Sequence, residues 1–475
     1  MRRFRACIFP ILTVLYLAAP GNALYAQEGP DHPPNIVLVI GDDHGYPYFG
    51  FTGSEHVRTP NLDLLAHEGT VFSFAHATAN YCRPSLHTLV TGLYPSQYRR
   101  IADRYHAEAV QGDPDWEAAS GEARRKRDAV FMSEVMRRFA TLPALLAENG
   151  YASFQAGKWW EGSYENGGFT EGMSQQWDME AWGKPGWFQL LMGGDGIAIG
   201  RDTMQPVFDF IDRHTDRPFF VWYGPSLPHT PLDAPFSHYK YYANTALSES
   251  AKQYYANCTW FDVGVGELLD HIEARGLREN TLIVYVNDNG WEQPPFEEYV
   301  GDHILYSNGG PKGKLSLHDL AFRTPVIFHW PGAIEPGIFG EDLVSTVDIA
   351  PTLLDYAGVA IPDDLKAMWP GQSLRPVIEG AGSIDRDMLV GHATQQRSED
   401  DVMGQSADHY YVRTPRWHFI WDAREGNTGT ASMQLYDMER DPEASENVIS
   451  GHPDLAPRFL EAITAWKANI VSSTE

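Results

Sequence analysis

The chain has 475 residues, 43% of them hydrophobic and 21% charged, which is typical of a folded globular protein. Its length predicts two or three domains, or one large domain with an appendage. The formal net charge of −27 argues against a nucleic-acid-binding protein, which needs a basic face to meet phosphates, whereas a local cationic pocket or a bound metal could still attract an anionic substrate.

The first residues have the pattern of a secretory signal. Three arginines precede a short apolar run at 8–19, and small residues near Ala23 and Ala26 offer cleavage positions. The run is too short for a membrane span. We therefore expect residues 1–26 to be a signal peptide and the mature protein to be secreted or periplasmic, with no membrane span.

Two cysteines, Cys82 and Cys258, lie beyond this segment, too few for a disulfide scaffold. Cys258 falls in a helical-looking run and is interpreted as a buried apolar residue. A disulfide between the two is the alternative.

The apolar run at 35–40 predicts a buried parallel strand that ends at two carboxylates, Asp42 and Asp43. Ligands of open α/β sheets lie at that end of the strands. Helices and strands alternate from there to residue 356, which predicts an α/β fold, a mostly parallel sheet with helices on both faces. The expected helices are 60–67, 84–89, 142–149, 248–275 and 349–356, and the further strands are 152–156, 218–223, 281–286 and 325–330.

The pattern changes after about residue 380. Short strands are expected at 409–412, 417–421 and 435–437, followed by a helix at about 455–470. We therefore expect a catalytic domain at 35–380 and a smaller C-terminal α+β subdomain with a short antiparallel sheet at 381–475.

Polar side chains follow several of the predicted strands, which places them at one edge of the sheet. An Asp-Asp pair alone more often forms a turn or a helix cap, so the signal is the co-occurrence. The oxygen ligands in this set suit Ca²⁺ best and Mg²⁺ second, and the set lacks the several His or Cys ligands that zinc prefers. The residues are Asp42, Asp43, Lys158, His229, Asp288 and Asn289.

Cys82 stands directly before Arg83-Pro84-Ser85, and Pro84 suits the first turn of a helix. Cys82 is then at a helix N-terminus, where free N–H groups and the helix dipole favour an anion. A buried structural cysteine at the start of a helix is the alternative.

The segment Cys82-Arg83-Pro84-Ser85, with Leu89-Val90-Thr91-Gly92 after it, resembles the signature of the formylglycine-dependent sulfatases of the alkaline phosphatase-like superfamily. The resemblance runs from about residue 35 to 447. Its further motifs are 35–43, Gly157-Lys158-Trp159, Pro228-His229-Thr230-Pro231, Asp288-Asn289-Gly290, 314–325, Asp348-Ile349-Ala350-Pro351-Thr352 and Leu435-Tyr436-Asp437.

The resemblance implies the role of each candidate residue. Asp42, Asp43, Asp288 and Asn289 would hold Ca²⁺ together with an oxygen of the modified Cys82. A formylglycine-generating enzyme would oxidise Cys82, and the hydrated aldehyde would attack sulfur and later expel sulfate. Lys158 and Lys314 would grip the sulfate oxygens, and His229 would protonate or stabilise the leaving oxygen.

Two positions depart from the family pattern. Leu86 stands where the family has an Arg that helps recognition by the modifying enzyme and supports the nucleophile. Trp160 stands where the family has a His that acts as base in the elimination step. His87 and His44 are candidate substitutes, although a packed or surface histidine is the simpler interpretation of His87.

Two stretches could select the substrate. The link 99–138 carries a mixed charge run at 122–128, which indicates a solvated helix face or a contact for a polyanionic sugar chain. Tryptophans could stack on sugar rings or close a core, and they are Trp159, Trp160, Trp177, Trp182 and Trp187.

The sequence therefore predicts a sulfatase that hydrolyses sulfate esters on a carbohydrate. A phosphate or phosphonate ester hydrolase of the same superfamily is one alternative. A non-catalytic protein that binds sulfated glycans is the other.

Overall fold

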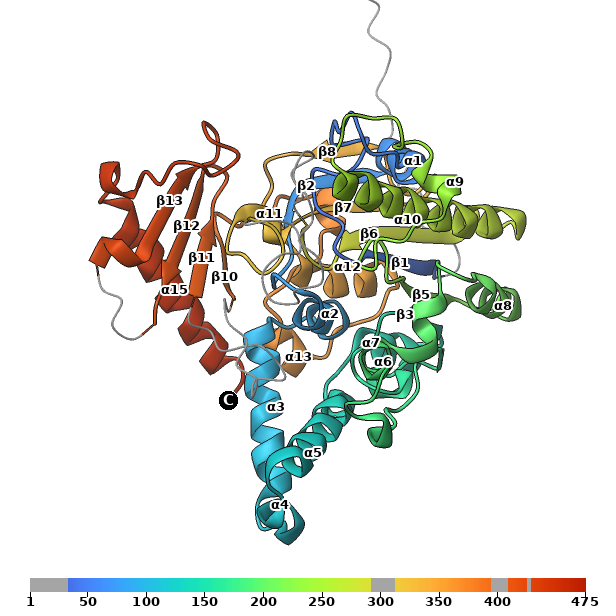
Figure 1. The fold of residues 1–475 in the computed structure, drawn as a ribbon, viewed down its shortest axis with the longest axis horizontal. Helices are drawn as coiled ribbons and strands as arrows, with labels where there is room; N and C mark the ends of the chain where they lie inside the picture. The colour runs from blue at the N-terminus through green and yellow to red at the C-terminus, as the bar shows by residue number, and fades with distance from the viewer. Residues whose placement is uncertain (1–32, 292–311, 394–408, 425–428) are drawn as a thin grey trace, which may run out of the picture. The chain divides into compact units, whose positions relative to one another are not determined.

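The computed structural model describes residues 33–291, 312–393, 409–424 and 429–475 (Figure 1), and the predicted signal segment lies outside these ranges. Within them, the helices are too short or too polar to cross a membrane. From His32 onward the chain forms one compact unit that contains two sheets.

The main sheet has nine strands in the order β4-β3-β5-β1-β6-β7-β2-β8, with β9 paired to β2. The centre is parallel, because β1 pairs in parallel with both β5 and β6. β7 runs antiparallel to β6 and β2, but the other strand pairs of this sheet are parallel. The predicted mostly parallel sheet is therefore confirmed. The strands are β1 (Asn35–Gly41), β2 (Thr70–His76), β3 (Ala152–Gly157), β4 (Glu171–Gly172), β5 (Phe219–Gly224), β6 (Thr281–Asn287), β7 (Arg323–His329), β8 (Gly337–Phe339) and β9 (Val344–Ser345).

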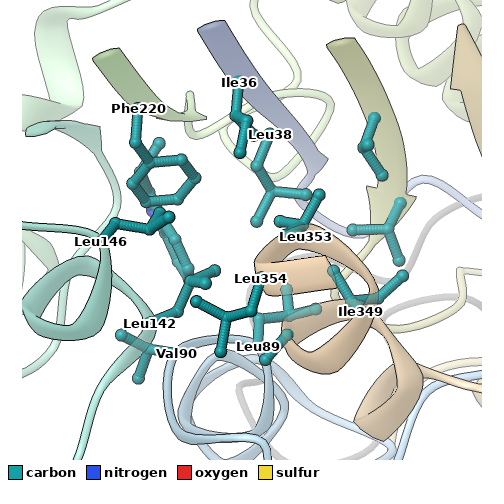
Figure 2. Packing of buried hydrophobic residues seen from close by; sticks show 14 of the residues in the cluster. Ile36, Leu38, Leu89, Val90, Leu142, Leu146, Phe220, Ile349, Leu353 and Leu354 are labelled. Carbon is teal, nitrogen blue, oxygen red and sulfur yellow. The ribbon is translucent and has the colours of Figure 1, made fainter. Parts of the chain in front are cut away.

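Helices cover both faces of this sheet, and β1 shows why an unbroken apolar strand is needed. Side chains alternate along a strand, so Ile36 and Leu38 enter one core while Val37 and Val39 enter the other. Figure 2 shows Ile36 and Leu38 facing side chains of three helices that cover the first face. Those helices are α2 (Cys82–Thr91), α6 (Leu142–Glu148) and α12 (Ile349–Tyr356), and the second face is covered by α1 (Pro60–Glu68), α8 (Gln205–Arg213) and α10 (Glu249–Ala274).

The C-terminal sheet is antiparallel, with the order β10-β11-β12-β13, as predicted for the last three strands. Phe459 and Ile463 of the last helix pack on it. The domain boundary near residue 380 stays a prediction. The elements are β10 (Leu389–Ala393), β11 (His409–Arg413), β12 (Trp417–Asp422), β13 (Met433–Asp437) and α15 (Leu455–Ser472).

Two regions show more structure than the sequence pattern predicts. β2 was not expected, because its seven residues follow α1 after a single glycine and contain a polar Ser73. The link 99–138 forms α3 (Pro95–Val110), α4 (Pro114–Ala118) and α5 (Gly121–Glu134). Its charged run lies on α5, where Lys126 pairs with Glu122 at 2.9 Å and Arg127 with Asp115 at 3.8 Å, as expected of a solvated helix face.

Candidate active site

The structure brings all eight predicted site residues together at the C-terminal edge of the parallel strands. β1 leads into Asp42 and Asp43, and β6 leads into Asp288 and Asn289. The other four come from the end of β3, the loop after β5, the start of α2 and the segment before α11 (Asp319–Phe322), and they are Lys158, His229, Cys82 and Lys314.

The carboxylates form a buried oxygen cluster. The Asp43 amide donates to Asp288 Oδ1 at 3.1 Å, and Asn289 Nδ2 donates to Asp43 Oδ1 at 2.7 Å. Burial, and then the nearby charge of Asp42, raises the pKa of Asp288 well above its usual range, which shows how costly the crowded negative charge is. Asp43 has a left-handed backbone (φ 62°), a conformation that Asp tolerates better than most residues.

This cluster fits a hard cation. Asp288 Oδ2 and Asn289 Oδ1 are buried, and neither has a hydrogen-bond partner among the described residues. Such atoms are rare in folded proteins and ask for an explanation. Atoms of Asp42, Asp43, Cys82 and His229 also lie within 4.8 Å of one another, as in a metal site. A divalent cation would satisfy the free oxygens and balance the carboxylates.

Two lysines face the cluster. Lys158 Nζ lies 2.5 Å from Asp42 Oδ1, and Lys314 Nζ lies 2.7 Å from Asp43 Oδ1 and 3.1 Å from Cys82 Sγ. Burial opposes the charge of Lys314, but the carboxylate of Asp43 raises its pKa above the usual range, so the ammonium persists. Both lysines therefore offer N–H donors to an anion beside Cys82.

The residues next to these two lysines have unusual backbone conformations. A Cβ on Gly157 would lie 2.0 Å from the Gly224 carbonyl oxygen, and the φ of Gly157 is 100°, so only glycine fits directly before Lys158. Leu315, which follows Lys314, has a φ of 70° and donates its amide to the Asn80 carbonyl at 2.9 Å. A left-handed leucine is uncommon and marks a position that its surroundings enforce.

Cys82 begins α2 and lies among the charged groups. Its Sγ is 3.6 Å from Asp42 Oδ1 and 3.8 Å from Asp43 Oδ1. Burial, and then the charge of Asp288, raises the pKa of this thiol far above its usual value, so the unmodified side chain is a neutral thiol and a poor nucleophile. The helix N-terminus and the two lysines nevertheless suit an anionic ligand at the same point.

His229 points its Nε2 toward the cluster, 3.6 Å from Asp43 Oδ2, while its Nδ1 lies 2.7 Å from the Thr230 carbonyl oxygen. This partner makes Nδ1 the donor in the neutral ring. Burial lowers the pKa of His229. Two residues far along the chain hold the loop, because Arg201 Nη2 donates to the His229 carbonyl at 3.0 Å and Asn257 Nδ2 to the Pro231 carbonyl at 3.0 Å. Neither residue is predictable from the sequence, since neither belongs to a recognisable motif.

Neither histidine proposed as a substitute base is oriented for that role. His44 is fully buried, and its ring nitrogens lie 2.8 Å from the Tyr48 carbonyl oxygen and 3.0 Å from the Tyr285 hydroxyl. His87 is also buried and donates Nε2 to Glu161 at 2.7 Å while stacking on a tyrosine of α3. Both are packed residues, the simpler of the two interpretations for His87.

Glu161 joins the two segments that carry the departures from the family pattern. Its carboxylate receives Arg83 Nε at 2.7 Å and Nη2 at 2.8 Å, in addition to His87. Arg83 follows Cys82, and Glu161 follows Trp160, so this buried group connects α2 to the Lys158 loop. Leu86, by contrast, packs into the core of the first sheet face.

The remaining cysteine and one tryptophan are core residues. Cys258 is completely buried in α10, and no disulfide links it to Cys82, so the alternative of a disulfide between them is wrong. Trp159 is 1% exposed and packs against Phe169 and Trp222, so it is unavailable to a ligand.

Comparison with known proteins agrees with this geometry. A sulfatase family model matches residues 34–359, and one described as N-sulphoglucosamine sulphohydrolase, C-terminal, matches residues 312–461. The arylsulfatase of Clostridium perfringens is 24% identical (88% of this chain, 90% of that protein), and the N-acetylgalactosamine-6-sulfatase of Canis lupus familiaris is 27% identical (86% and 76%).

A solved structure of a protein in complex with its substrate D-glucosamine-2-N,6-O-disulfate shares the fold. Its TM-score is 0.65 at 19% identity, with 93% of this chain and 98% of that chain covered. The family match extends over most of the chain and includes every strand of the parallel centre. The chain belongs to the sulfatase family and is a sulfuric ester hydrolase.

Proposed function

We propose that this enzyme hydrolyses sulfate esters on a carbohydrate and that Cys82 acts after oxidation to formylglycine. The observation that carries the proposal is the position of Cys82 Sγ, 3.1 Å from Lys314 Nζ and beside the carboxylates of Asp42 and Asp43. A neutral buried thiol has no evident role there, whereas an oxygen at the same point would face both lysines and the oxygen cluster. Support for a carbohydrate comes from the relatives that act on sulfated hexosamines.

A divalent metal would be held by Asp42, Asp43, Asp288 and Asn289, with an oxygen of the modified Cys82 completing the set. Ca²⁺ is the first choice and Mg²⁺ the second, because the ligands are hard oxygens. Such a metal would supply positive charge to polarise the sulfate group. The two free oxygens of Asp288 and Asn289 are the structural feature that this metal would satisfy.

The chain's own residues orient the ester and handle its charge. Lys158 and Lys314 bind the sulfate oxygens. The ammonium group of Lys158 lies beside Asp42 and that of Lys314 lies beside Asp43, so both are positioned at the oxygen cluster. His229 carries its transferable proton at Nε2 when the ring is protonated and gives it to the leaving alcohol oxygen. Formylglycine at position 82 would supply a hydrated aldehyde as the nucleophile, with a second hydroxyl that would allow sulfate to be released.

The location and the maturation of the protein belong to the same proposal. Residues 1–26 direct the chain to the periplasm or the exterior, residues 35–380 form the catalytic domain, and 381–475 form the C-terminal subdomain. A formylglycine-generating enzyme modifies Cys82 despite Leu86 in place of the usual Arg. Phosphate and phosphonate ester hydrolysis is the competing activity, because the same metal ligands could serve it.

The test compares the mass of the Cys82 peptide with turnover in protein from its native host. We expect the peptide to carry formylglycine, and Cys82→Ala to lose essentially all turnover while keeping the fold. Cys258→Ala is the matched control, because it removes the other cysteine of the mature protein, which lies in α10 and is not an active-site residue. This variant should keep both the modification of Cys82 and the turnover. The substrates are N-acetylgalactosamine 6-sulfate, N-acetylglucosamine 6-sulfate and the matching phosphate esters.

Each outcome separates the alternatives. Faster release of sulfate than of phosphate supports the proposal, and the reverse preference favours the phosphohydrolase. An unmodified thiol together with full sulfatase activity would exclude the formylglycine mechanism. An unmodified thiol with binding of sulfated sugars but no turnover would indicate a protein that only binds them.

A further inference from the structure

Aromatic side chains, most of them partly exposed, form two groups of ring contacts in the segment that follows β3. We name the two groups together the aromatic flank. One group is Trp160 and Phe188, whose ring centroids are 5.7 Å apart, and in the other group the Trp187 ring lies 6.4 Å from Trp177 and 4.6 Å from Trp182. Phe188 is 47% exposed, and Trp160, Trp182 and Trp187 are partly exposed, whereas Trp177, in the same group of contacts as Trp187, is buried. The aromatic flank consists of Trp160, Trp177, Trp182, Trp187 and Phe188.

The aromatic flank lies beside two cationic side chains, Lys158 of the active site and the buried Arg83. Lys158 Nζ lies 5.8 Å from the centre of the Trp160 ring, and the same nitrogen lies 2.5 Å from Asp42. The guanidinium of Arg83, the residue after Cys82, lies 5.9 Å from the centre of the Trp177 ring. A ligand held by Lys158 through its sulfate group would therefore have the Trp160 ring beside it.

The aromatic flank is held in a fixed position relative to Cys82. Glu161, directly after Trp160, binds Arg83 and His87 of α2 through three hydrogen bonds of 2.7 to 2.8 Å. At its other end, α7 (Trp187–Met192) is anchored by the Met192 carbonyl, which accepts the Trp159 amide at 2.7 Å. Rings that are already positioned lose little conformational entropy when a ligand packs on them.

The composition of this surface indicates the class of ligand. An isolated exposed ring is ordinary on a protein surface, whereas adjoining exposed rings beside a charged clamp mark a binding surface. Flat apolar faces suit the C–H faces of a sugar ring, and the adjacent ammonium suits its sulfate. Trp160 also stands where the family pattern has a histidine, so a ring face replaces a titratable group at this point.

We propose that the aromatic flank is the sugar-binding subsite of this enzyme, with the pyranose part of the sulfated substrate packed against Trp160 and Phe188. The proposal rests on the carbohydrate sulfatase activity proposed above. It assigns the sulfate to the two lysines and the sugar ring to the aromatic flank, so the two parts of the substrate can be tested separately.

The test measures KM for N-acetylgalactosamine 6-sulfate and N-acetylglucosamine 6-sulfate, and the inhibition constant of inorganic sulfate, which lacks the sugar. Phe188→Leu keeps an apolar side chain but removes the ring, and it should raise KM for the better substrate by roughly 3- to 10-fold, the value of one aromatic contact. Phe188→Tyr keeps the ring and should retain the parent KM. Neither change should alter inhibition by inorganic sulfate.

Ile338→Ala is the matched control, because Ile338 is an apolar side chain that is 78% exposed on β8, and its KM should equal that of the parent. Equal KM values for Phe188→Leu and Phe188→Tyr would overturn the subsite, as would a parallel loss of inhibition by inorganic sulfate. If the parent protein cleaves neither sugar, the proposed function fails by itself. The subsite is then decided by calorimetric binding of the same sugars, which Phe188→Leu must weaken and Phe188→Tyr must not.

Discussion

Glu161 is buried beneath the active site and compensates the charge of Arg83, so its removal should destabilise the protein strongly. The side chains of Glu161 and Arg83 are 2% and 9% exposed, and the pair is bidentate, with the additional hydrogen bond from His87. Burial would raise the pKa of Glu161, but the charge of Arg83 holds it below its usual range, so the carboxylate is ionised. Glu161→Ala leaves a buried guanidinium without its counter-charge.

The expected loss is about 3–5 kcal/mol in the free energy of unfolding, the cost of breaking a buried pair from one side. Urea unfolding measures it as a shift of the midpoint at constant slope. Glu165→Ala is the matched control four residues away, because Glu165 pairs with Arg137 at 3.8 Å with both side chains more than half exposed. A surface pair of that kind contributes about 0–1 kcal/mol.

A double substitution separates charge from packing. Arg83→Met with Glu161→Leu replaces the pair by apolar side chains of similar size, and it should recover most of the stability, because no buried charge remains alone. Turnover should stay reduced in both Glu161→Ala and the double variant, since each loses the link between α2 and the segment that carries Lys158 and Glu161. Equal midpoint shifts for Glu161→Ala and Glu165→Ala would show that the buried charge of Arg83 does not depend on Glu161 for its stability.

Two further predictions concern the metal and the pH. Asp288→Ala should abolish both turnover and the binding of Ca²⁺ or Mg²⁺ in metal analysis, whereas stoichiometric zinc with activity restored only by zinc would contradict the oxygen-ligand site. Burial lowers the pKa of His392 to about 4 from 6.5, so stability present above pH 6.5 is lost as the pH falls and the unfolded chain binds the proton. His392→Leu should therefore reduce the loss between pH 7 and pH 5 by about 2 kcal/mol in urea unfolding, and an unchanged loss would contradict the assignment.

Much of the active-site edge of the sheet was predictable, because Asp42, Lys158 and Asp288 each follow a locally recognisable strand. The apolar run before Asp42 predicts a buried strand, as does the run before Asp288, and both runs form buried strands. Parallel strands place their C-terminal ends together, so the spatial cluster follows from the alternation of elements. The ordered motifs then supplied the family, and the family match confirmed it.

The supports of the site depend on contacts between distant parts of the chain. Glu161 meets Arg83 across 78 residues, and Asn257 meets the His229 loop across 26 to 29 residues. Single polar residues carry no periodicity that a sequence pattern could reveal. Burial decides their role, because an ionised side chain inside the protein must find a partner wherever the fold brings one.

The α/β class, the strand ends that carry Asp42 and Asp288, and the place of Cys82 at the start of a helix all follow from local sequence patterns. The folded structure was needed to show which histidines are packed, which tryptophan belongs to the core and which aromatic rings remain partly exposed near Lys158. The physical reason is that hydrophobic periodicity fixes local elements, whereas the burial of any one side chain depends on all the elements packed around it.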